Sequence, residues 1–147
     1  WFWSHATGKC VPCESQGFIL VRVSSQWICT RLISSSLMSF SASKSACLSL
    51  GWSLITPIFA SDISPIAQAY PTYRIWIDMQ TSIGSSNYVN SLFPTNTSNW
   101  DSFISTSLAS DYSTYSYALQ IIGWYDQTML FEGNTNLDTG HALCAFY

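Results

Sequence analysis

Five cysteines are the residues of this chain best suited to chemistry, and their contexts narrow what that chemistry is. Cys10-Val11-Pro12-Cys13 has the form of a redox Cys-x-Pro-Cys motif. Such a motif acts at a helix N-terminus behind a strand, where the thiolate is stabilised, whereas β-rich sequence follows it here. The uneven spacing and the lack of paired histidines argue against zinc. Disulfides in an oxidising compartment explain the set better. The other three cysteines are Cys29, Cys47 and Cys144.

Residues that serve in catalysis are sparse elsewhere in the sequence. The two histidines, His5 and His141, are not accompanied by an evident nucleophile with an orienting acid. The eight acidic residues are spread singly, and no glycine-rich phosphate loop is present. We therefore expect no enzyme activity, no cofactor and no metal site.

The composition indicates an unusually uncharged domain. Charged residues make up 9% of the 147 residues, against about 25% in ordinary soluble domains. The length favours one domain with a substantial core, and the hydrophobic content of 48% argues against disorder. The net charge is −3 without a basic stripe, which argues against nucleic-acid binding. No apolar run is long enough for a membrane span. Serine and threonine replace the charges, which suits adhesion, glycan coverage or self-assembly.

Two elements are expected in the first half of the chain with clear local signals. Two β-rich runs, 18–23 and 26–32, flank Ser24-Ser25 and predict a hairpin. The stretch from Ser39 to Leu50 predicts a helix that Ser39 caps and Gly51 ends.

The remaining elements are expected on weaker signals. A second helix is predicted over 62–70, and a central strand over 73–79. Residues 81–116 are polar and aperiodic, and a loop region of that length is normally functional or specifically packed. The last three strands are expected at 117–122, 128–132 and 142–147. The aromatic residues expected in the core are Trp27, Trp52, Trp76 and Phe131.

Three segments together carry a family resemblance. The first is Cys13-Glu14-Ser15-Gln16-Gly17-Phe18 with Cys29 behind it, and the second is Ala46-Cys47-Leu48-Ser49-Leu50-Gly51-Trp52-Ser53-Leu54. The third is Trp76-Ile77-Asp78-Met79, with Asp78 in place of a glycine. In order and spacing they resemble the N-terminal hairpin, first helix and core strand of a long-form C-type lectin-like domain. The resemblance covers residues 13–147.

The resemblance implies an α+β fold in which two helices flank small antiparallel sheets and a long-loop region. It implies the disulfides Cys13–Cys29 and Cys47–Cys144. The second closes a loop large enough to contribute roughly 4–5 kcal/mol in the simple chain-entropy treatment. Cys10 is then the odd cysteine, which points to an intermolecular bridge or a free thiol. The alternative to the Cys13–Cys29 disulfide is a Cys10–Cys13 disulfide, which would leave Cys29 as the unpaired cysteine.

The chain departs from the family where sugar-binding members hold calcium. It lacks the inner disulfide near the last strands, and Phe93 stands before Pro94-Thr95-Asn96 where those members have an acidic or amide residue. Calcium needs six to eight oxygen ligands, and the long-loop region offers the carboxylates of Asp101 and Asp111 alone. We therefore expect a calcium-free scaffold.

Other features point to an extracellular location. Asn96-Thr97-Ser98 is an N-glycosylation acceptor in a stretch where a loop is expected. Beside the cysteines, it supports a secreted protein.

The first twelve residues form an aromatic tail ahead of the domain at 13–147. Trp1, Phe2 and Trp3 are hard to bury within that domain. The tail either docks onto a neighbouring copy or packs back onto its own domain.

Two hypotheses of function follow. The first is a secreted, calcium-independent recognition module that binds a protein or glycan through the long-loop aromatics Tyr88, Trp100 and Tyr112. The second is a structural subunit of an extracellular glycoprotein filament or matrix, which self-assembles with identical subunits through its tail.

Overall fold

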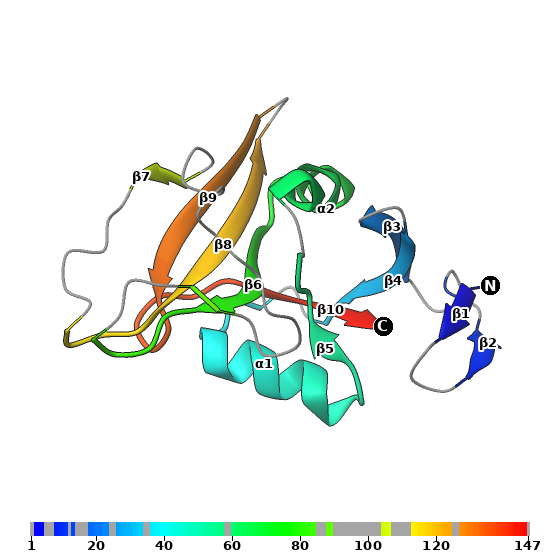
Figure 1. Cartoon of the computed structure of the whole chain (residues 1–147), viewed down its shortest axis with the longest axis horizontal. Helices are drawn as coiled ribbons and strands as arrows, with labels where there is room; N and C mark the ends of the chain where they lie inside the picture. The colour runs from blue at the N-terminus through cyan, green and yellow to red at the C-terminus, as the bar shows by residue number, and fades with distance from the viewer. Residues whose placement is uncertain are drawn as a thin grey trace.

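The computed structural model describes residues 2–4, 8–11, 13, 18–23, 26–33, 36–57, 60–84, 88–89, 104–106, 113–124 and 127–146. Within these ranges the chain has an α+β architecture with two α-helices and a mixed sheet, so the predicted fold class is confirmed at that level (Figure 1). The expected small antiparallel sheets are wrong. Most of the described strands join one eight-stranded sheet, which contains parallel as well as antiparallel pairs.

The strand β10 (His141–Phe146) lies inside this sheet and connects its two halves. It pairs antiparallel with β4 (Gln26–Leu32) on one side. On its other side it pairs first parallel with β6 (Arg74–Gln80) and then antiparallel with β5 (Ser53–Leu54). The parallel pairing is the part that the sequence did not predict, because it joins segments about sixty-five residues apart through a long connection.

The second half of the sheet is a long antiparallel ribbon next to β6. In it, β8 (Tyr117–Trp124) pairs with β6 and with β9 (Gln127–Asn134). The short strand β7 (Ile104–Thr106) adds to β9 in parallel at the edge. The three predicted C-terminal strands are confirmed, and the first two are longer than expected.

Helix α1 (Phe40–Ser49) begins and ends where its sequence predicts. Ser39 is the N-cap, and its side-chain oxygen accepts a hydrogen bond from the Ala42 amide at 3.3 Å. Gly51 follows the helix with a φ of 75°, the left-handed conformation that glycine adopts without strain. Phe40, Ser43 and Cys47 form the buried stripe of the helix.

Helix α2 (Ile63–Ala69) follows a 3₁₀ turn, η1 (Ala60–Asp62). It buries Ile63, Ile66 and Ala67 and ends before Pro71. Proline after a helix is expected, because it cannot continue the helical hydrogen bonds.

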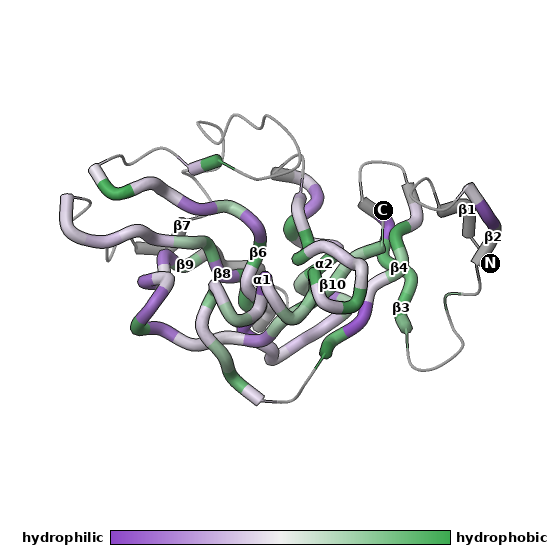
Figure 2. Tube along the Cα trace, turned by 90° about the horizontal axis from the view of Figure 1, so that it is seen from below, coloured by the Kyte–Doolittle hydropathy of each residue, from purple (hydrophilic) through white to green (hydrophobic). Residues whose placement is uncertain are grey.

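Two hydrophobic clusters lie on opposite sides of β6, because alternate side chains of a strand point to opposite faces. Ile75, Ile77 and Met79 join the larger cluster, to which α2 contributes. Trp76 joins the smaller cluster beneath α1, together with Phe40 and Cys144. Figure 2 shows hydrophobic residues along β3, β4 and β10.

Trp76 has very close backbone neighbours, and it is fully buried as predicted. Its ring packs edge-on against Phe40 at 5.6 Å between centroids, and its Nε1 donates to the Met38 carbonyl at 2.9 Å. A Cβ at Gly133 would lie 2.6 Å from the Trp76 ring, so only glycine fits there.

The predicted hairpin is present as β3 (Ile19–Val23) and β4, but its exposed face differs from expectation. Val21 and Ile28 are opposite each other and buried in the larger cluster. Trp27 was predicted to be in the core, but its side chain is 57% exposed. It lies on the other face of the hairpin from Val21 and Ile28, next to its cross-strand partner Arg22, which is also exposed. A strand pattern shows two faces but does not show which one another element covers.

The N-terminal tail forms structure of its own. Strand β1 (Phe2–Ser4) pairs antiparallel with β2 (Lys9–Val11), and β1 lies against β4. The first strand of the tail therefore finds its partner strand within the tail itself. Trp1 lies outside the described residues.

Candidate functional site

Of the three aromatic residues predicted to bind a ligand, the structure describes Tyr88 alone. Tyr88 is 7% exposed and belongs to the larger hydrophobic cluster, so this prediction is wrong. Its neighbour Val89 is 54% exposed instead. Trp100 and Tyr112 lie outside the described residues, as does the acceptor Asn96.

The long region after β6 starts and ends at one end of the sheet, where three strands meet. The Thr81 amide donates to the Tyr117 carbonyl at 2.8 Å, and the Tyr117 amide donates to the Thr81 hydroxyl at 2.9 Å. The Thr135 amide donates to the Ser116 carbonyl at 3.1 Å. The end of β6, the start of β8 and the end of β9 are thereby joined, at the lower left of Figure 1.

Four large apolar side chains are exposed at this end of the sheet, and we call them the apolar end. The exposed fractions are 66% for Ile83, 54% for Val89, 42% for Tyr115 and 72% for Leu137. Val89 is fixed to β6 by two backbone hydrogen bonds to Gln80, of 2.9 and 3.0 Å. The four residues lie in the connections at the ends of three adjacent strands, and neighbouring strands of a sheet are about 4.8 Å apart.

A tight turn holds Leu137 outward. The Asn134 side-chain oxygen accepts hydrogen bonds from the amides of Asn136 and Leu137, at 3.0 and 3.2 Å. The Asn134 amide in turn donates to Asp138 at 2.6 Å. These bonds satisfy the backbone of the turn locally, as an Asx turn does, so Leu137 stays exposed on an ordered loop.

The sequence contains a signal for the apolar end that motif analysis missed. Ile83 and Leu137 are single large apolar residues within runs of turn-forming residues, Thr-Ser-Ile-Gly-Ser and Asn-Thr-Asn-Leu-Asp. A turn has no buried face, so an isolated leucine or isoleucine there is expected to reach solvent.

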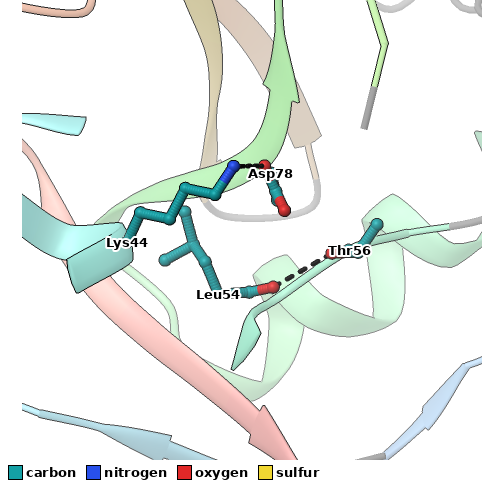
Figure 3. A network of polar contacts seen from close by, with 4 residues as sticks. All are labelled: Lys44, Leu54, Thr56 and Asp78. Atoms are coloured by element: carbon teal, nitrogen blue, oxygen red, sulfur yellow. Dashed lines mark hydrogen bonds and ion pairs between the residues drawn. The ribbon is translucent and has the colours of Figure 1, made fainter. Parts of the chain in front are cut away.

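The pair Lys44–Asp78 is the one ion pair among the described residues, and it lies in the interior. The Lys44 Nζ atom is 3.2 Å from Asp78 Oδ1 (Figure 3). The side chain of Asp78 is 4% exposed and that of Lys44 is 30% exposed. The pair joins α1 to β6, beside Thr56, whose hydroxyl donates to the Leu54 carbonyl at 3.0 Å. Because the Asp78 carboxylate is almost fully buried and is paired with a lysine of α1, we interpret the pair as structural.

Tyr70 and Thr30 form a second buried polar contact, 2.7 Å between their oxygens. The Thr30 hydroxyl also lies 2.8 Å from the Ile19 carbonyl, to which it donates its one proton, so Tyr70 is the donor to Thr30. Burial raises the pKa of the Tyr70 phenol above its ordinary value of 10.0, and the hydrogen bond with Thr30 offsets part of that rise.

Both disulfides implied by the family resemblance are present in the structure. Cys13–Cys29 anchors residue 13 to the hairpin, and Cys47–Cys144 joins α1 to β10 across 97 residues of sequence. Four of the five cysteines of this sequence are thereby paired, and Cys10 is the fifth.

Neither a metal centre nor a membrane helix emerges from the described ranges. No group of three or more His, Cys, Asp or Glu side chains gathers there in a way that could hold a metal ion. No helix in the same ranges is long and apolar enough to cross a membrane.

No family model matches the chain, and no curated protein matches it.

Proposed function

We propose that this chain is a secreted, non-enzymatic recognition and adhesion module of the C-type lectin-like kind. It binds a protein or glycan partner without calcium, through the apolar end. The observation that carries the proposal is the exposure of four large apolar side chains at the margin of the long-loop region, on a scaffold with two disulfides. Exposed apolar groups gathered at one place on a soluble domain typically mark an interaction site.

The chemistry of the apolar end favours a protein partner over a sugar. Three of its four side chains, Ile83, Val89 and Leu137, are aliphatic and offer no aromatic face for stacking. Tyr115 is the aromatic member, and tyrosine is enriched at protein interfaces. The exposed polar residues around it, such as Ser82 and Thr114, are suited to the hydrogen-bonding rim of such an interface.

The secreted location rests on the disulfide framework. Two intramolecular disulfides are typical of proteins that fold in an oxidising compartment.

Arrays of extracellular proteins and of glycans, probed with calcium and again with EGTA, test the proposal. We expect binding that EGTA leaves unchanged and that Ile83→Asp with Leu137→Asp abolishes. Leu48→Asp is the matched control, because Leu48 is also 60% exposed but lies on α1. Binding that requires calcium, or that the paired apolar-end substitution leaves intact, would contradict the proposal.

The alternative function is a structural subunit of an extracellular filament or matrix, and Cys10 is the observation that favours it. Cys10 lies on β2, which pairs with β1 in the N-terminal hairpin. It takes part in neither of the two disulfides, Cys13–Cys29 and Cys47–Cys144. Light scattering with and without reductant tests this alternative. Large species that reductant or removal of residues 1–8 dissolves would support it, and a monomer in both conditions would contradict it.

A further inference from the structure

The chain divides its charges unevenly along its length. All five lysines and arginines precede Ile75, whereas six of the eight acidic residues follow Arg74. The first part of the chain therefore carries excess positive charge, and the second part carries negative charge alone.

In the folded chain, the basic and the acidic residues discussed here lie at different ends of the molecule. The strands β3 and β4 lie at one side of the sheet, and the start of β8 and the end of β9 lie beyond β6. Along the longest axis of the molecule, β3 and β4 are near the right of Figure 1 and the apolar end is at the lower left. Asp138 is exposed at the apolar end, where no lysine or arginine accompanies the described residues.

The opposite end presents a basic surface around an exposed tryptophan, which we call the hairpin end. Arg22 and Trp27 are directly opposite each other on β3 and β4, so their side chains share one face, and both are exposed. Lys9 is exposed on β2, in the hairpin whose other strand lies against β4. Tryptophan and arginine are the side chains most enriched among residues that dominate binding energy.

We propose that the hairpin end of one copy binds the apolar end of a second copy. The inference rests on the proposed function, because it takes the apolar end as a binding surface and names its partner. The two surfaces are complementary: one offers a tryptophan with cations, and the other offers aliphatic side chains with a carboxylate. The small proportion of charged residues also leaves little repulsion between copies.

Such a contact joins two different surfaces of the same chain. It therefore leaves one hairpin end and one apolar end open after each addition, and the assembly grows as an open row unless its rotation closes a ring. This arrangement is suited to adhesion between identical molecules and does not use the Cys10 thiol.

Two variants test the contact, each blocked at one end. Trp27→Glu places an acid at the hairpin end, and Ile83→Ser with Leu137→Ser removes aliphatic groups from the apolar end. All of these residues are exposed, so the fold is expected to persist. Both variants, and the reference chain, carry Cys10→Ser to remove intermolecular disulfides.

Sedimentation or light scattering over a concentration series then gives the answer. We expect the reference chain to grow beyond a dimer, and each variant to associate at least about 30-fold more weakly. An equimolar mixture of the two variants should stop at the dimer, because it contains one intact hairpin end and one intact apolar end.

A monomeric reference chain, or a mixture that forms no dimer, would overturn this inference. If Trp27→Glu abolished assembly while Ile83→Ser with Leu137→Ser left it unchanged, the contact would join two hairpin ends and the inference would also fail. A monomer that nevertheless bound array ligands through the apolar end would sink the self-association and leave the proposed function standing.

Discussion

The two faces of β6 are stabilised in different ways. The face towards α2 carries Ile75, Ile77 and Met79 and belongs to the larger, mainly aliphatic cluster. The face towards α1 carries Trp76 and Asp78 above a helix that buries three side chains. That smaller face has the disulfide Cys47–Cys144 and the pair Lys44–Asp78 in addition. The comparison teaches that a covalent bond and an ion pair hold a helix whose apolar stripe is small.

Removing the disulfide of the α1 face should have the largest effect. Cys47→Ser opens a cross-link over 97 residues, worth about 4–5 kcal/mol in the chain-entropy treatment. We expect little folded protein in the medium of expressing cells, measured as secreted yield and melting temperature. Cys10→Ser is the control and should fold normally. A normal yield and melting curve for Cys47→Ser would show that the disulfide is dispensable.

On the α2 face, deletion of one aliphatic side chain should cost less than the disulfide. Ile66→Ala removes a fully buried side chain and is expected to lower the unfolding free energy by about 3 kcal/mol. Denaturant titration measures it, with Leu48→Ala, exposed on α1, as the control. A loss below about 1 kcal/mol would mean that the cluster repacks around the vacancy.

Breaking the ion pair should have a smaller effect again. Lys44→Met leaves the buried Asp78 without its cation, and we expect a loss of about 1–2 kcal/mol, reduced because Lys44 itself is partly exposed. The double variant Lys44→Met with Asp78→Leu should recover most of that loss, since an apolar pair replaces two charges. If the double variant is less stable than Lys44→Met, the pair stabilises α1 more than this account allows.

The smallest effect is expected on the α2 face at alkaline pH. The pKa of Tyr70 is raised in the folded state, so above pH 10 the unfolded chain releases this proton first. The contribution of Tyr70 is therefore complete below pH 10 and is lost as pH rises through the folded pKa. Denaturant titrations from about pH 8 to about pH 11 should show a smaller decline in Tyr70→Phe than in Tyr73→Phe. Equal declines would remove Tyr70 as the cause.

Local features of the fold could be predicted from the sequence because they depend on neighbouring residues. The cap at Ser39 and the stop at Gly51 are set within a few positions of α1, and both are as predicted. The predicted hairpin also lies where its two β-rich runs indicate. In each case the determining residues are adjacent in the chain.

Burial could not be predicted where distant segments decide it. Trp27 lies in a β-rich run and was predicted to be buried, but its side chain is exposed. Tyr88 lies in a polar run and was predicted to be exposed, but its side chain is buried. Trp27 belongs to neither hydrophobic cluster of the described residues, whereas Tyr88 enters the larger cluster, to which Ile77 and Met79 also belong. The residue pattern of a strand or loop does not indicate which distant element will cover its side chains.

The central place of β10 has a consequence for biosynthesis. A ribosome makes residues 141–146 after every other described strand, yet these residues lie between β4 and β6 and carry Cys144. Until they emerge, no described strand pairs the two halves of the sheet, and Cys47 lacks its partner Cys144 while Cys10, Cys13 and Cys29 are already made. Correct cysteine pairing therefore depends on the last segment arriving before the earlier thiols have reacted with one another.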